Sequence, residues 1–142
     1  MWKTPTIVPA LDVDDVGKVA AWLEEAFGFK ERRESRLTGA DFVLTWLEIG
    51  EDGLLSLSQS STPDPEPQGN EALKVYVADL DAHFERARRA GAEILEEPRD
   101  GFWGGRTYRA RDPSGHRWEF SQAGVDRDSR DWDLPPGIKR GA

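Results

Sequence analysis

Glu119 is the side chain of this chain that is best placed to do chemistry. Residues 117–121 read Arg-Trp-Glu-Phe-Ser. Successive side chains of a strand point to opposite faces, so Trp118 and Phe120 are predicted on an apolar face and Glu119 on the other. A carboxylate there either faces solvent or lines a cavity. In a hydrophobic hollow without a cation its pKa would be raised, which suits cation binding or a general base.

A tight turn precedes this strand. Residues 112–115 read Asp-Pro-Ser-Gly, in which proline pre-sets one backbone angle and glycine tolerates a positive φ. Residues 105–122 are therefore predicted to form a β-hairpin.

The rest of the chain supplies elements that could position this hairpin. In the first half, residues at helical spacing follow a cap at Asp14 or Asp15 and end at Gly28. This helix is flanked by predicted strands at residues 6–13, 29–36, 41–49 and 53–60. In the second half, Asp79 caps a helix that ends at Gly91, with predicted strands at residues 72–78 and 93–96 and a long loop before the hairpin.

The two halves repeat one pattern. The helix caps Asp15 and Asp79 lie 79 − 15 = 64 residues apart, and the helix stops Gly28 and Gly91 lie 91 − 28 = 63 apart. This agreement predicts an α+β fold of two βαβββ modules, a curved mixed sheet around a cavity with the helices outside. The expected bounds are 1–60 and 71–122 for the modules, 61–70 for a proline-rich linker and 123–142 for a tail. Pairing of the modules within one chain or between two chains is left open.

Charge and residue composition exclude several kinds of binding partner and chemistry. Lys plus Arg number 19 against 27 for Asp plus Glu, a net charge of −8. An acidic surface repels phosphate backbones, so no nucleic acid partner is expected. The chain has no cysteine, which excludes thiolate chemistry. No apolar run is long enough to cross a membrane, and a cytoplasmic location is expected.

Three segments resemble the vicinal oxygen chelate superfamily, which includes glyoxalase I, extradiol dioxygenases and the bleomycin-resistance proteins. They are VDDVGKVAAWLEEAFGF at 13–29, VYVADLDAHFERARRAGAEI at 75–94 and YRARDPSGHRWEF at 108–120. In the metal enzymes of the superfamily each module supplies one ligand from its first strand and one from its last. The resemblance puts these positions at Val8, Ser56, Ala72 and Glu119. One carboxylate among them cannot hold a divalent cation, so no metal and no cofactor are expected.

Neither histidine is expected to restore a metal site. His83 is predicted on the surface of the second helix, away from the sheet. His116 is predicted to begin a strand and to bond to the preceding turn.

The function expected from the resemblance is metal-independent binding of a small molecule. The bleomycin-resistance branch implies a homodimer that sequesters an antibiotic or a similar cationic or aromatic ligand. Aromatic side chains provide flat apolar surfaces for such a ligand. The candidate ligand-binding residues are Trp46, Ser56, Tyr76, Trp103, Arg106, Tyr108 and Glu119.

Several alternatives stay open at this level. The main one is a glyoxalase-like lyase, isomerase or dioxygenase with an atypical or metal-free site that uses Glu119; no catalytic residue is assigned. Arg106 either binds a ligand carboxylate or phosphate, or pairs with Glu119 or Asp100. Trp22 and Trp118 are expected in the core. The tail either wraps a neighbouring subunit through Trp132 or is disordered.

Overall fold

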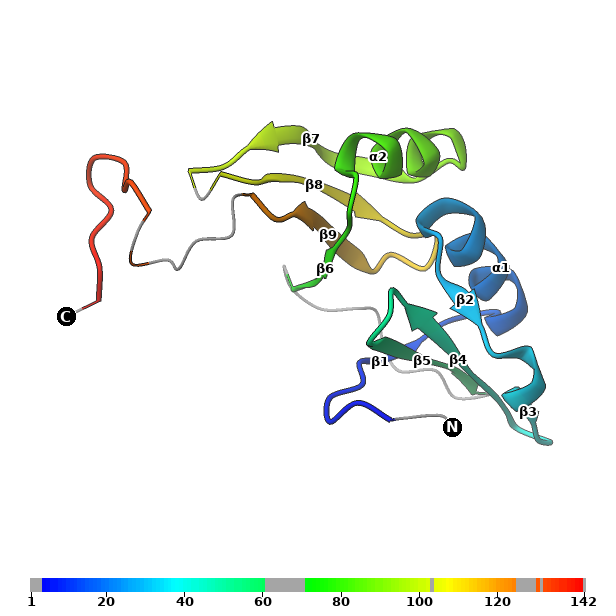
Figure 1. Cartoon of the computed structure of the whole chain (residues 1–142). Coiled ribbons are helices and arrows are strands. Elements are labelled where there is room, and N and C mark those ends of the chain that lie inside the picture. The colour runs from blue at the N-terminus through cyan, green and yellow to red at the C-terminus, as the bar shows by residue number, and fades with distance from the viewer. Residues whose placement is uncertain (1–3, 61–70, 103, 125–129, 131, 142) are drawn as a thin grey trace.

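The computed structural model describes residues 4–60, 71–102, 104–124, 130 and 132–141. The predicted linker at 61–70 and Trp103 lie outside the described residues. The fold is α+β, as expected, with two helices and two mixed sheets (Figure 1). Neither helix is long and apolar enough to cross a membrane.

The first module contains a five-stranded sheet and one helix. Its helix α1 (Val16–Phe27) begins after Asp15, whose side chain accepts from the Lys18 amide at 3.1 Å, and it ends at Gly28 in the left-handed region. The strands are β1 (Ala10–Asp12), β2 (Lys30–Glu31), β3 (Leu37–Thr38), β4 (Phe42–Ile49) and β5 (Gly53–Ser60), in the order β1-β5-β4-β2 with β3 also on β4.

The prediction of one continuous strand at residues 29–36 was wrong. The short strands β2 and β3 are separated there by a 3-10 turn, Arg33–Ser35. The buried side chain of Glu31 provides a reason. It accepts two hydrogen bonds from Arg36, at 2.7 and 2.8 Å, and one from the Thr45 hydroxyl at 2.7 Å. The chain must curl back for Arg36 to reach this carboxylate, and a straight strand would carry it away.

The second module repeats the arrangement with four strands. Helix α2 (Leu80–Arg89) begins after its cap Asp79. The strands β6 (Ala72–Tyr76), β7 (Glu93–Asp100), β8 (Arg106–Arg111) and β9 (Arg117–Gln122) lie in the order β6-β9-β8-β7. Part of the expected long loop after residue 96, residues 97–100, is instead strand. β7 continues to Asp100 as an edge strand, and its two register shifts against β8 accommodate Pro98.

The two modules share details beyond their strand order. In each, a glutamine of the last strand accepts from the first amide of the helix at 2.8 Å: Gln59 from Val16, and Gln122 from Leu80. These pairs are offset by 122 − 59 = 63 and 80 − 16 = 64 residues. A repeated cap of this kind confirms the repeated βαβββ pattern.

The modules are joined on the helix side. Trp22 of α1 donates from Nε1 to the Ala90 carbonyl at the end of α2, at 2.9 Å. In return Arg86 of α2 donates to the carbonyls of Glu24 and Glu25 near the end of α1, at 2.9 and 2.7 Å. Each helix thus donates to carbonyls at the end of the other, in addition to the bond that Gly28 already donates to Glu24 within the first module. Figure 1 shows α1 and α2 beside each other on the same side of the molecule.

One apolar core runs under both helices. Trp118 and Phe120 of the second module lie 5.6 and 4.7 Å, between ring centroids, from Phe27 of the first. Both are fully buried, as the sequence predicted for Trp118, and Trp22 packs at the edge of the same cluster. Because these rings bridge the modules, the core fixes how the two sheets sit relative to each other.

Candidate functional site

The face of the second sheet that the helix does not cover carries a row of charges. Glu119 lies between its register partners Lys74 and Arg109. Its carboxylate is 2.9 Å from Arg109 Nη2 and 3.6 Å from Lys74 Nζ. The case of a carboxylate without a cation in a hydrophobic hollow therefore does not apply to Glu119, because cross-strand partners supply two cations. Tyr76 continues this face, with its ring 62% exposed and 5.4 Å from Lys74 Nζ.

The same face of the first sheet carries uncharged residues at the positions that correspond to Arg109 and Glu119. Trp46 and Ser56 are register partners, and Ala10 pairs with Ser56 on its other side. These residues occupy the repeat positions of Arg109 and Glu119, since 109 − 46 and 119 − 56 both equal 63. The structure therefore brings Trp46 together with Ser56, and Tyr76 together with Glu119, but on different sheets.

Arg106 and Tyr108 lie on the other face of the second sheet. Tyr108 is fully buried and pairs in register with Phe120, so it belongs to the core and does not share a face with Glu119. Arg106 donates to Asp100 at 2.9 Å and to Asp81 at 3.0 Å, and these hydrogen bonds raise its pKa. The predicted pairing with Asp100 is confirmed, whereas Glu119 is bound by other cations.

His83 lies in the seam between the modules, and its predicted surface position was wrong. One ring nitrogen, Nε2, is 3.0 Å from the Phe27 carbonyl and the other, Nδ1, is 2.6 Å from the Tyr108 hydroxyl. The carbonyl can only accept, so Nε2 carries the proton and Nδ1 accepts from the hydroxyl. Burial raises the pKa of Tyr108, which keeps this hydroxyl protonated. The network fits neutral histidine, and burial lowers the pKa of His83.

The structure therefore predicts that acid weakens the fold through His83. The folded-state pKa of His83 lies below the ordinary value of 6.5. The stability that neutral His83 supplies is therefore fully present when the pH is above 6.5. This stability is lost as pH falls toward the folded pKa, with a slope of at most about 1.4 kcal/mol per pH unit. We expect urea unfolding between about pH 7 and pH 5 to show this slope in the wild type. A His83→Gln variant should lose most of the slope; an unchanged slope would contradict the assignment.

His116 connects the second hairpin to the first module. Its amide donates to Asp112 Oδ1 at 3.1 Å, which confirms the predicted bond to the turn. Its ring Nε2 lies 3.0 Å from the Asp12 carbonyl at the end of β1, a contact that the sequence did not indicate.

A crevice lies between the β4–β5 turn of the first module and strand β6 of the second. Its volume is about 620 Å³, within the range of sites for small organic ligands. The N-terminal segment, the end of the β4–β5 hairpin and strand β6 form its walls. The apolar part of the lining includes Ile7, Pro9, Leu54, Leu73, Val75 and Trp118.

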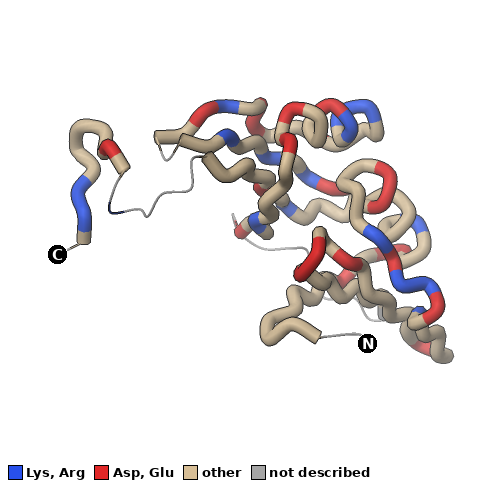
Figure 2. Tube along the Cα trace, in the orientation of Figure 1, with Lys and Arg blue, Asp and Glu red and all other residues tan. Residues whose placement is uncertain are grey.

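The charged rim of the crevice is mainly acidic. Glu51 and Asp52, in the turn between β4 and β5, line it opposite Lys74 and Tyr76. Figure 2 shows this acidic turn directed toward the β6 strand. Lys74 is already close to Glu119, whereas Glu51 and Asp52 form no ion pair with any residue that the structure describes. The electrostatic field at the rim therefore favours a cation.

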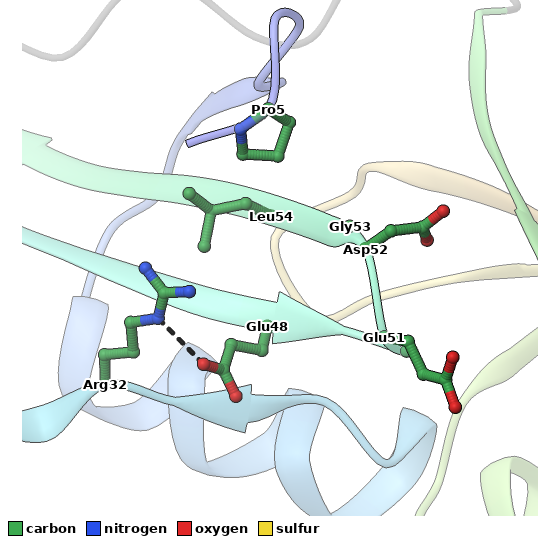
Figure 3. Close-up of a pocket in the computed structure, with 8 residues that line it drawn as sticks. Pro5, Arg32, Glu48, Glu51, Asp52, Gly53 and Leu54 are labelled. Carbon is green, nitrogen blue, oxygen red and sulfur yellow. Dashed lines mark hydrogen bonds and ion pairs between the residues drawn. The ribbon is translucent and has the colours of Figure 1, made fainter. Parts of the chain in front are cut away.

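A smaller pocket of about 300 Å³ lies on the other side of the same turn (Figure 3). Pro5 covers Leu54 there, and Arg32 donates to Glu48 at 2.9 Å. Glu51 and Asp52 point away from this pair. Because Arg32 and Glu48 bind each other in this pocket, it is a weaker candidate for a ligand site than the crevice.

Comparison with known proteins places the whole arrangement in one family. The sequence model of the Glyoxalase/Bleomycin resistance protein/Dioxygenase superfamily matches residues 8–120. The chain belongs to this superfamily. Within it, TioX from Micromonospora sp. ML1 is 29% identical, with a TM-score of 0.66 over 87% of this chain and 100% of that one.

Other relatives extend the comparison without fixing a function. An uncharacterized protein of Mycobacterium tuberculosis (strain ATCC 25618 / H37Rv) is 29% identical over 128 residues, which are 83% of this chain and 74% of that protein. The fosfomycin resistance protein FosX of Listeria monocytogenes, solved with Mn(II), is 17% identical with a TM-score of 0.66, covering 89% of this chain and 94% of that one. At this identity the likeness extends to the fold alone.

The positions that would hold a metal ion in the superfamily do not suit one here. Val8, Ser56, Ala72 and Glu119 offer one carboxylate, one hydroxyl and two hydrocarbon side chains. The carboxylate is already bound by Arg109 and lies near Lys74. No group of three or more histidine, aspartate or glutamate side chains among the described residues is arranged to hold an ion. The donor set therefore does not fit a divalent cation.

Proposed function

We propose that this protein binds a small organic cation without a metal ion, in the crevice between the β4–β5 turn and β6, and that it acts by sequestering this ligand. The observation that carries the proposal is the crevice itself, with an apolar lining and an acidic rim. The lining offers apolar surface that a bound ligand would remove from water, and Glu51 and Asp52 favour a positive charge at the mouth. Membership of a superfamily whose name includes bleomycin resistance supports an antibiotic-like ligand.

An enzymatic role for Glu119 has less support. A general base must be free to take a proton from the substrate. Here Arg109 and Lys74 already flank the carboxylate. A lyase, isomerase or dioxygenase that uses Glu119 would first have to displace these cations.

A titration with two dyes tests the proposal. Ethidium is a planar aromatic cation, and anilinonaphthalene sulfonate is an apolar anion. We expect saturable one-to-one binding of ethidium that persists in a chelator, and binding of the anion that is weaker by about tenfold or more. Equal affinity for both dyes, or loss of ethidium binding in the chelator, would contradict the proposal.

A matched pair of variants locates the site. Ile7 lines the crevice and is 81% exposed, so Ile7→Lys adds a cation at the mouth at little cost in folding. Ile138 is also exposed but does not line the crevice, and Ile138→Lys makes the same change of charge elsewhere. Only Ile7→Lys should weaken ethidium binding, by about tenfold. Equal effects of the two variants would place the dye elsewhere.

We also propose that the protein is a homodimer. Leu37 and Phe42 are 51% and 49% exposed, and they share the uncovered face of the first sheet with Leu44 and Trp46. An apolar patch of this kind is typical of a subunit interface. Light scattering should give twice the chain mass for the wild type and the chain mass for Phe42→Glu. A monomeric wild type would refute this part of the proposal.

A further inference from the structure

Strand β6 has an unpaired edge. It is the terminal strand of its sheet, with β9 as its neighbour on the other side. In this parallel pair the Val77 amide donates to the Ser121 carbonyl at 2.8 Å. Alternate residues of a parallel strand turn their backbone groups to opposite edges, so Lys74 and Tyr76 direct their N–H and C=O groups away from β9. Both residues line the crevice, so this edge opens into it.

The facing edge of β1 is partly closed. By the same alternation Ala10 and Asp12 direct their backbone groups away from β5, since the Pro9 carbonyl accepts from Ser56. The Asp12 carbonyl is already within 3.0 Å of His116 Nε2. Among the described strands none pairs with the outer edge of either β1 or β6. Of the two strands only β6 lines the crevice, where Lys74 and Tyr76 bring backbone hydrogen-bonding groups beside the apolar side chains.

The surroundings of β6 select the kind of chain that could pair with it. Leu73 and Val75 also line the crevice; they alternate with Lys74 and Tyr76 and pack against the apolar core. Glu51 and Asp52 lie in the turn opposite, and the chain as a whole has a net charge of −8. A second copy of this acidic chain would bring further negative charge to the rim. An extended cationic chain would pair with the open edge and neutralise it.

We propose that the ligand is peptide-like: an extended, cationic, amide-bearing molecule that adds as a strand to the edge of β6. This inference rests on the proposed function and names its ligand class. Amide groups of the ligand exchange hydrogen bonds with the backbone of Lys74 and Tyr76. Alternate groups of the ligand reach the apolar lining, and its positive charge lies near Glu51 and Asp52.

Two peptides and two variants test this pairing. The first probe is acetyl-Lys-Val-Lys-Val-Lys-amide, and the second is the same peptide N-methylated at alternate residues, which removes donors but keeps charge. In the protein, Tyr76→Ala removes the ring, whereas Tyr76→Pro removes the ring and the outward N–H. Proline is tolerated where the N–H of an edge strand faces away from the sheet. Calorimetric titration would measure both comparisons. We expect the N-methylated peptide to bind more weakly than the unmethylated one, by about tenfold or more. We expect the unmethylated peptide to bind the Tyr76→Pro variant more weakly than the Tyr76→Ala variant, by about tenfold or more.

The outcomes separate this inference from the proposed function. If ethidium binds but the peptide does not, or if N-methylation and Tyr76→Pro have no added effect, the crevice binds small cations and the strand pairing is wrong. If neither probe binds, both proposals fail. Slow hydrogen exchange at the amides of Lys74 and Tyr76 in the free protein would mean that a second copy covers the edge. This result would also overturn the inference.

Discussion

Trp118→Ala is expected to lower the free energy of unfolding by about 3–5 kcal/mol, because it empties the centre of the shared core. The indole is fully buried and contacts Phe27, Phe29 and Phe120. It therefore joins the sheet of the second module to the helix end of the first. Urea unfolding at neutral pH would measure the loss.

The Trp118→Phe variant separates packing from hydrogen bonding. Nε1 of Trp118 donates to Asp112 Oδ2 at 2.9 Å, and burial raises the pKa of this carboxyl while the indole bond opposes the rise. Phenylalanine keeps most of the packing but leaves Oδ2 without this donor, at a cost of about 1–3 kcal/mol. The cost applies to the ionised carboxylate, so it should shrink as pH falls and Asp112 becomes protonated. If Trp118→Phe lost as much unfolding free energy as Trp118→Ala, or if its loss did not change with pH, this explanation would be contradicted.

Glu31→Ala is expected to destabilise the protein by about 2–3 kcal/mol, since it removes the acceptor of a buried hydrogen bond as well as an ion pair. The Thr45 hydroxyl is fully buried and donates to Glu31 at 2.7 Å. Arg36, one-third exposed, can be rehydrated, so the threonine accounts for much of the cost. Thermal or urea unfolding would measure it.

Glu48→Ala provides the matched control. Glu48 lies on the next strand and also accepts from an arginine, Arg32, at 2.9 Å, but its side chain is 38% exposed. Glu48 is partly exposed but Arg32 is only 16% exposed, so this change should cost about 1 kcal/mol, less than Glu31→Ala. Equal losses from the two substitutions would show that burial of Glu31 does not determine its contribution.

The repeated parts of the fold were predictable from the sequence because their causes are local. The caps Asp15 and Asp79 and the stop Gly28 act within one helical turn of their own helix. The alternation around Trp118 identified the buried face of β9 for the same reason. The same hairpin also indicates where Tyr108 lies. Counting outward from the turn pairs Tyr108 with Phe120, and cross-strand partners share a face, which puts Tyr108 in the core.

The features that the sequence did not predict correctly depend on contacts with other segments of the chain. His83 is covered by the end of α1, 56 residues earlier in the chain, and nothing in the pattern of α2 indicates this neighbour. The strand predicted around Glu31 is broken where Arg36 turns back to the Glu31 carboxylate, and the burial of that carboxylate beside Thr45 of another strand is not visible in the local pattern. The charges that flank Glu119 follow from strand register. The crevice depends on the separation of the β4–β5 turn from β6, which periodicity does not specify.

Metal analysis combined with ligand titration tests the central claim, binding without a metal ion, most directly. The protein would be purified without a chelator, and its zinc, nickel, manganese and iron content measured in the wild type and in Glu119→Gln. Ethidium titration would follow before and after dialysis against a chelator. The account predicts substoichiometric metal in both proteins and one unchanged dissociation constant. One equivalent of metal that disappears in Glu119→Gln, together with ligand binding that disappears with it, would contradict the account.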